Sequence, residues 1–249
     1  VATAGTGTTV RMFLQAPDVV VNRSYAAILV GSGDREKPLA DSGLDRFYMF
    51  KDKETATTVT AGDGTALATW PLAGDATAFN NMVDIANVAP AEAKAGLSDP
   101  GNNGWFRALA PGEKVVNAAL TAAGLVYFST RTPSPPSLTC GSNLGVARTY
   151  GLRFQDGAAG RDLNGDGVRD ERDVAVTLTG GGLPPSAVAG LVNVLDSATG
   201  RTVVLPYVIG AGGTAGGQPG SASQNAPAKI EVKLSKKRRK TYWFINANP

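Results

Sequence analysis

The chain has 249 residues, of which 18% are charged, with a formal net charge of +3, no histidine and one cysteine. This composition excludes a Ser-His-Asp triad, a Cys-His dyad, a histidine-ligated zinc site and an internal disulfide framework. No apolar run approaches the roughly 20 residues of a membrane-spanning helix, so we expect no membrane-spanning segment. The 31 glycines and 15 prolines punctuate short apolar segments, a profile typical of one all-β domain with many short strands.

Segments with the length and pattern of β-strands recur along the chain. Their residue ranges are 27–30, 47–50, 125–128, 147–154, 174–178, 192–195, 203–205 and 229–235. The last range is the clearest, because Ile230, Val232 and Leu234 alternate with polar residues and so predict one buried and one solvated face. The range 174–178 has the same two-residue period and begins directly after an acidic loop. We therefore expect that loop to lead into a strand.

Helical periodicity is nearly absent. The exception is residues 91–95, which follow Pro90 and predict a helix of one or two turns with proline at its first position. Residues 132–143 and 210–225 are rich in turn-forming residues, and we interpret them as surface loops of a single sheet system. We expect one domain over residues 1–249, with repeated units of about 40–45 residues, the size of a four-stranded propeller blade.

The acidic loop, residues 162–173, matches the pattern D-x-[DN]-x-[DN]-G of calcium-binding loops. In that pattern the side-chain oxygens at alternate positions turn inward together, and the glycine, here Gly167, allows a sharp turn. The expected ligand residues are Asp162, Asn164, Asp166, Val168 through its backbone carbonyl, Asp170 at position 9 and Asp173 at position 12. The helix-flanked version of this loop carries a bidentate glutamate at position 12, so we expect Asp173 to be a weaker ligand.

Two interpretations of this loop compete, a solvated turn of aspartate and glycine or a site for one divalent cation. By ordinary residue frequencies the pattern would arise by chance in a chain of this length with a probability of about 1%. Five carboxylates against Arg169 and Arg172 leave a local charge of roughly −3, which repels itself at close range. These considerations favour calcium over magnesium, which prefers rigid octahedral sites. Because the preceding segment lacks a helical pattern, we expect a calcium clip between two strands.

Several short motifs occur in an order that is similar to that of one protein family. The run ILVGSGDREKPLADSGLDRFYMFKD, within residues 27–52, is followed by GWF at 104–106, GEKVVN at 112–117, GLVYF at 124–128, GVARTY at 145–150 and then the acidic loop. Between Ser24 and Trp243 this order resembles the C-terminal propeller of the PilY family. Members of that family are type IV pilus biogenesis factors and tip-associated adhesins.

The resemblance implies a modified β-propeller that forms the C-terminal domain of a larger, exported protein. It also implies a nine-residue calcium site, with Asp173 outside it, on Asp162, Asn164, Asp166, the Val168 carbonyl and Asp170. The implied function is to support pilus biogenesis, the balance of pilus extension and retraction, and surface adhesion. The implied partners are pilins or minor pilins, at the pilus tip, the cell surface or the outer membrane.

The resemblance does not cover every feature of that family. The variable N-terminal region of the family is missing, so we expect a processed or truncated fragment, in which the propeller can be incomplete. The chain carries no Arg-Gly-Asp tripeptide, so integrin binding is not expected. The receptor for adhesion is therefore left open by the sequence.

Other patterns have simpler interpretations. Trp70, Trp105 and Trp243 are expected in the core between blades, and Cys140 has no partner in the chain. The basic residues 236–240 suit an exposed turn in a closing hairpin, so we expect no nucleic-acid contact. The alternative function is an extracellular, glycosidase-like propeller enzyme with a structural calcium, since paired carboxylates could occur among 21 acidic residues. No catalytic motif supports that alternative, and we expect a protein that is not an enzyme.

Overall fold

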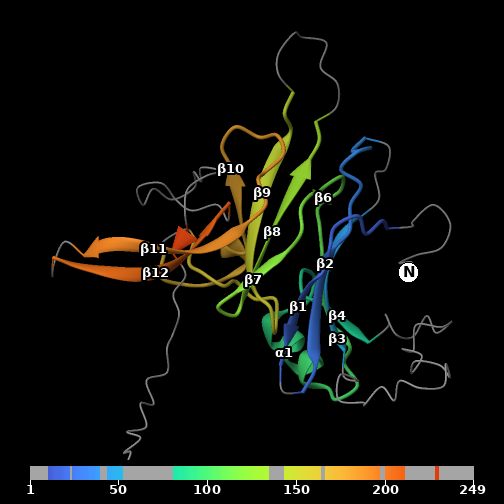
Figure 1. Cartoon of the computed structure of the whole chain (residues 1–249). Helices are drawn as coiled ribbons and strands as arrows, with labels where there is room; N and C mark the ends of the chain where they lie inside the picture. Colours follow the sequence, from blue (N-terminus) through green and yellow to red (C-terminus); the bar gives the residue numbers. More distant parts are fainter. Residues whose placement is uncertain are drawn as a thin grey trace, which may run out of the picture.

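Strands dominate the computed structural model of the chain (Figure 1). The structure describes residues 11–22, 24–39, 44–52, 81–134, 143–163, 166–196, 200–210 and 228–229. Within these ranges the strands form three sheets, so the predicted all-β class is confirmed. All three sheets stay open in this part of the chain, and the closed ring of a propeller is not observed there.

The first sheet has five strands in the order β1-β2-β3-β5-β4. These strands are β1 (Asp18–Val21), β2 (Ala26–Gly31), β3 (Arg46–Asp52), β4 (Met82–Asp84) and β5 (Gly104–Ala108). Neighbouring strands are antiparallel except β4, which runs parallel to β5. A parallel pair requires a crossover, and the helix α1 (Pro90–Ser98) lies in it. The helix begins at Pro90, as predicted, and runs three residues beyond the predicted end at Ala95.

The second sheet is built around the antiparallel pair of β8 (Leu125–Thr132) and β9 (Val146–Arg153). The strand β10 (Ala175–Leu178) pairs with β9, and β6 (Lys114–Val115) and β7 (Leu120–Ala122) both pair with β8. All of these pairings are antiparallel. The acidic loop lies between β9 and β10 in the chain, so its predicted position between two strands is confirmed.

Aromatic side chains fill the space between the first two sheets. Phe47 of β3 stacks on Phe128 of β8 with ring centroids 3.8 Å apart, and Phe128 stacks on Tyr150 of β9 at 4.7 Å. Trp105 is fully buried in the same core, and its Nε1 donates a hydrogen bond to the carbonyl of Phe154, 3.0 Å away. The predicted core position of Trp105 is therefore confirmed.

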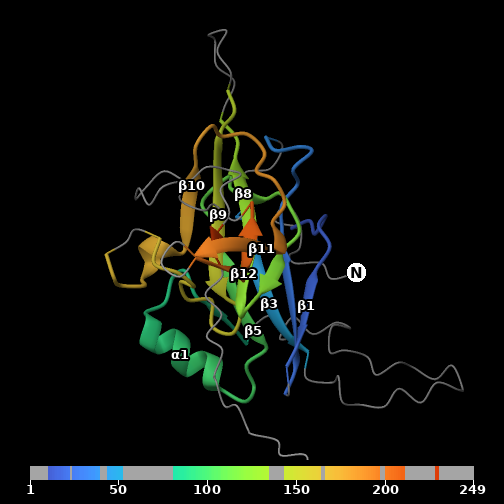
Figure 2. The same cartoon turned by 60° about the vertical axis from the view of Figure 1, so that its left-hand side comes forward.

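The third sheet contains β11 (Val188–Asp196), β12 (Arg201–Ile209) and β13 (Ala228–Lys229), in that order. Its hairpin of β11 and β12 extends away from the other two sheets in Figure 1 and comes toward the viewer in Figure 2. The strands of the described residues are thus divided among three sheets. After β10, three consecutive glycines, 180–182, all have positive φ and redirect the chain.

Some sequence-based predictions fall outside the described residues. They concern Asn164, the predicted strand beyond Lys229, most of both surface loops, Cys140, Trp70, Trp243 and the basic residues 236–240. Among the residues that the structure describes, no helix combines the length and the apolar character that a bilayer crossing requires.

Candidate metal centre

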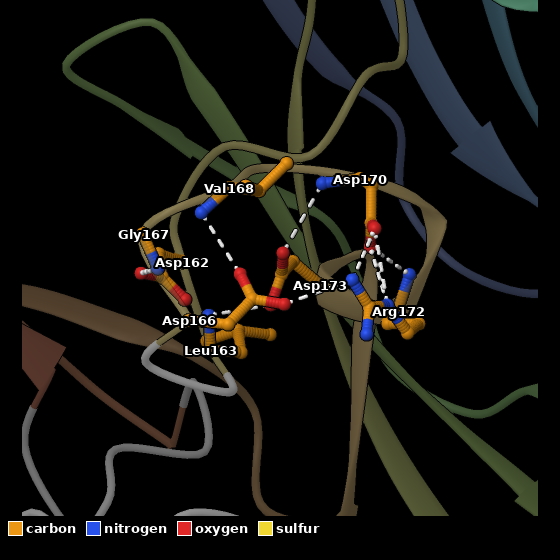
Figure 3. Close-up of polar contacts among 8 residues, drawn as sticks. All are labelled: Asp162, Leu163, Asp166, Gly167, Val168, Asp170, Arg172 and Asp173. Carbon is orange, nitrogen blue, oxygen red and sulfur yellow. Dashed lines mark hydrogen bonds and ion pairs between the residues drawn. The ribbon is translucent and has the colours of Figure 1, made fainter.

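The acidic loop is closed by hydrogen bonds between its own residues (Figure 3). Asp162 Oδ2 accepts a hydrogen bond from the backbone N–H of Gly167 at 2.8 Å, so the loop bends back onto its first residue. Gly167 has a φ of +82°, in the left-handed region that favours glycine, which agrees with its predicted role in a sharp turn. Asp166 Oδ1 accepts a hydrogen bond from the N–H of Val168 at 2.8 Å, which fixes its carboxylate on the same turn.

Asp173 joins the two ends of the loop. Its Oδ1 accepts a hydrogen bond from the N–H of Leu163 at 2.8 Å, and its Oδ2 accepts one from the N–H of Asp170 at 3.1 Å. It is the last residue of the 3-10 helix η3 (Glu171–Asp173), whose first turn Asp170 caps. The Asp173 side chain is fully buried, and a buried carboxylate favours a positive charge nearby.

Three carboxylates converge in this loop, with oxygen atoms of Asp162, Asp166 and Asp173 within 4.8 Å of one another. Two ligands on opposite sides of a calcium ion are about 4.6–5.2 Å apart, because calcium–oxygen distances are about 2.3–2.6 Å. The cluster therefore has the size that one such ion requires. Carboxylate donors suit calcium, magnesium or manganese rather than softer metals. These three residues could hold a divalent metal ion.

Arg172 brings a positive charge to the same loop. Its Nη2 lies 2.8 Å from Asp166 Oδ2 and 2.7 Å from Asp170 Oδ2. Hydrogen bonds from the Arg172 side chain and backbone lower the pKa of Asp170, and the Asp170 carboxylate raises the pKa of Arg172. The Arg172 side chain is exposed, and exposed ion pairs of this kind contribute little to stability. Another cation can therefore compete with this guanidinium for Asp166.

The structure separates the predicted ligand residues into two groups. Those whose carboxylates come together are Asp162, Asp166 and Asp173. The Asp170 carboxylate lies against Arg172 instead, Val168 exposes its side chain, and Asn164 lies outside the described residues. The nine-residue site implied by the PilY resemblance counts Asp170 and leaves out Asp173. The carboxylate cluster of the structure instead contains Asp173 and leaves out Asp170.

An ion pair that the sequence did not indicate ties the loop to the first sheet. Arg107 Nη2 of β5 lies 2.5 Å from Glu171 Oε2 of η3. Arg107 is largely buried, whereas Glu171 is exposed. The two residues are 64 positions apart, and a single arginine in a strand carries no sequence signal of its partner. The contact could therefore be found only from the structure.

A second group of charges, the buried ion cluster of Asp45, Glu113 and Lys114, links the first two sheets. Lys114 Nζ lies 3.2 Å from Asp45 Oδ2, and both side chains are almost fully buried. Glu113 accepts hydrogen bonds from the strands beside it, the side-chain donors being Thr130, Arg148 and Tyr150. Burial, and then the neighbouring Glu113 carboxylate, raise the pKa of the Tyr150 phenol. Every carboxylate oxygen of Asp45 and Glu113 accepts a hydrogen bond, so this cluster is a structural link.

Comparison of the chain with protein-family models, with curated proteins and with solved structures finds no match in any of the three. We therefore infer the function from the acidic loop, from its connections to the sheets and from the sequence motifs. Of the acidic loop and the buried ion cluster, only the acidic loop brings carboxylates together near the surface.

Proposed function

We propose that residues 162–173 bind one calcium ion and that the chain is a calcium-dependent binding protein rather than an enzyme. The observation that carries this proposal is the convergence of the Asp162, Asp166 and Asp173 carboxylates within 4.8 Å. Like charges at such distances repel, and the repulsion is stronger where water is excluded, as around the buried Asp173. A divalent cation among the three carboxylates would replace this repulsion with attraction.

Calcium suits this loop better than magnesium. Calcium accepts six to eight oxygen ligands in irregular geometry, whereas magnesium requires a near-octahedral set and retains several waters. Three carboxylates that bind through one or two oxygens each can satisfy a variable coordination number. The exposure of Asp166 leaves access for water ligands, and the Val168 carbonyl and Asn164 would supply the remaining ligands that the loop pattern predicts.

Ion binding would rearrange the charges of the loop. Arg172 bridges Asp166 and Asp170, and a cation bound to Asp166 would compete with the guanidinium for that carboxylate. Arg172 would keep Asp170 as its partner. Because Glu171 in the same short helix pairs with Arg107 of the first sheet, the ordered loop would be held against the body of the domain.

The sequence motifs extend the proposal to type IV pili. On the resemblance to the PilY family, we propose that the chain is the C-terminal, propeller-type domain of an exported pilus biogenesis factor. Two antiparallel sets of four strands, β1-β2-β3-β5 and β10-β9-β8-β6, support this architecture because each has the strand number of one blade. Calcium would then control a contact with pilins or minor pilins at the pilus tip or cell surface.

Titration calorimetry on the whole chain tests the metal site. Calcium should bind with a dissociation constant in the range of about 10⁻⁶–10⁻³ M, and magnesium more weakly. Asp162→Ala should abolish binding. Asp99→Ala is the matched control, because Asp99 is also exposed and accepts a hydrogen bond from a nearby backbone N–H, that of Gly101. The absence of any heat of binding at millimolar calcium would rule out the site.

Surface piliation and twitching motility test the pilus role separately. Asp162→Ala should retain its far-ultraviolet dichroism, lose calcium binding and change piliation or motility when it replaces the native residue in the producing cell. The Asp99→Ala control should behave as the native protein does. If Asp162→Ala loses calcium binding but leaves piliation and motility unchanged, calcium has only a structural role and the proposed regulation of the pilus by calcium is wrong.

A further inference from the structure

Among the strands of the described residues, β11 is the longest that lies at the edge of a sheet. It has nine residues and stands at the end of the order β11-β12-β13. The other edge strands in the described ranges are β1, β4, β6, β7, β10 and β13, and they have two to four residues. A long edge presents a row of backbone N–H and C=O groups that another strand can pair with, and short edges limit that risk.

Both faces of this edge are apolar and exposed. On one face Leu191 and Leu195 are 76% and 67% exposed, and on the other Val188 and Val192 are 60% and 40% exposed. The neighbouring strand β12 adds one exposed apolar side chain to each of these faces. Val204 is paired with Asn193 and so shares the face of the leucines, and Ile209 is paired with Val188. Exposed apolar side chains on two faces of one projecting hairpin indicate a surface that another polypeptide covers.

The strand β11 lacks the charged residues and prolines that would protect an edge strand from pairing with another strand. Its sequence VAGLVNVLD contains no lysine, arginine or proline, which are the residues that commonly block an edge. The one charged residue, Asp196, is at the end of the strand, where it is paired in register with Arg201 of β12. An occupant of this edge must therefore be an uncharged, apolar strand of similar length.

We propose that β11 pairs antiparallel with β11 of a second copy of this chain, in a register centred on Val192. A second copy offers a strand of equal length that is uncharged up to its last residue, with the same two apolar faces, and twofold symmetry makes the contact self-complementary. In this register Asp196 of each copy faces Val188 of the other, so like charges do not meet. The product is a continuous six-stranded sheet. This inference does not rest on the calcium site.

Sedimentation velocity over a concentration series tests the proposal. The chain should show a reversible monomer–dimer equilibrium. Val192→Lys places two lysines opposite each other at the centre of the pairing and should weaken dimerisation roughly tenfold. Val19→Lys is the matched control, because Val19 is an exposed valine on the edge strand β1. A monomer at all concentrations, or a dimer that Val192→Lys does not weaken, would overturn the proposal.

Cysteine cross-linking checks the register without relying on a charged variant. In a Cys140→Ser background, Val192→Cys should form an intermolecular disulfide, because directly opposite residues lie about 4.5–5.5 Å apart between Cα atoms. Leu195→Cys should not, since its counterpart is then about 20 Å away along the strands. Cross-linking of Leu195→Cys, or of neither variant, would contradict this pairing. Monomers that capture another protein through β11 would also contradict it.

Discussion

Glu113 and Asp173 are both buried carboxylates, and they differ in what surrounds them. Glu113 receives hydrogen bonds from Thr130 and Tyr150 and forms an ion pair with Arg148, all on the rigid strands β8 and β9. Asp173 receives hydrogen bonds from two backbone N–H groups and has two further carboxylates within 4.8 Å. The first arrangement neutralises a buried charge within the fold, and the second gathers negative charge on a loop.

This difference indicates where the protein can respond to its surroundings. In the buried ion cluster, Lys114 of the second sheet and Asp45, directly before β3 of the first sheet, are both excluded from solvent, so breaking this pair requires that the two sheets separate. In the loop, the cationic partner Arg172 is exposed and can be replaced by a metal ion without unfolding the core. We therefore expect mutations in the cluster to change stability, and mutations in the loop to change ion binding.

The largest effect is expected from Lys114→Ala. This change leaves Asp45 buried without its cation, which should lower the free energy of unfolding by about 3–5 kcal/mol in urea denaturation. The double variant Asp45→Leu with Lys114→Met is the control, because it removes both charges and keeps apolar volume. It should recover much of the loss. Equal losses in both variants would mean that packing, not the buried charge, determines the effect.

Calcium should stabilise the protein through the loop alone. At about 100-fold excess over the dissociation constant, linkage predicts about 2.7 kcal/mol of added stability, measurable as a change in urea unfolding against a chelator. Asp162→Ala should lose this increment. Lys114→Ala should keep it, because the two sites share no partner and their contributions should add. A chelator effect that disappears in Lys114→Ala would show that the two regions are coupled.

Asp173 should contribute both to the stability of the fold and to calcium binding. In the absence of calcium, Asp173→Ala removes the acceptor of two backbone N–H groups and should cost about 1–3 kcal/mol of unfolding free energy. Asp173→Asn retains an acceptor oxygen, so it should be less destabilised while binding calcium poorly. If Asp173→Asn binds calcium as tightly as the native protein, Asp173 is a structural residue and not a ligand.

The smallest effect is expected from Arg172→Gln. Removing the guanidinium frees Asp166 from its competing cation, so calcium affinity should rise about two- to fivefold in calorimetry. Arg153→Gln is a matched control, because Arg153 also forms an exposed ion pair with an aspartate, Asp156. A fall in calcium affinity in Arg172→Gln would mean that Arg172 supports the ion-binding conformation.

The longer strands were predictable because their apolar pattern extends over enough residues to be recognised. The predictions for 27–30 and 147–154 match β2 and β9 within one residue at each end, and the prediction for 125–128 begins where β8 begins but stops four residues before its end. Shorter strands such as β6, with two residues, and β4, with three, carry no measurable period and were missed. Their positions depend on pairing with β8 and β5, which a linear pattern does not contain.

The acidic loop was predictable as a unit because oxygen-bearing residues at alternate positions and a glycine have a recognisable spacing. Which carboxylates converge was not predictable, because η3 turns Asp173 inward and leaves Asp170 against Arg172. That choice depends on a single helical turn between positions 170 and 173. The link from Glu171 to Arg107 depends on how the second sheet packs on the first, and no local pattern encodes it.

A crystal structure of the chain grown with calcium would show whether the acidic loop holds the ion. We expect one ion at about 2.3–2.6 Å from carboxylate oxygens of Asp162, Asp166 and Asp173, with the Arg172 guanidinium displaced from Asp166. Calcium bound elsewhere, or a loop without an ion in which Arg172 still bridges Asp166 and Asp170 at saturating calcium, would contradict it.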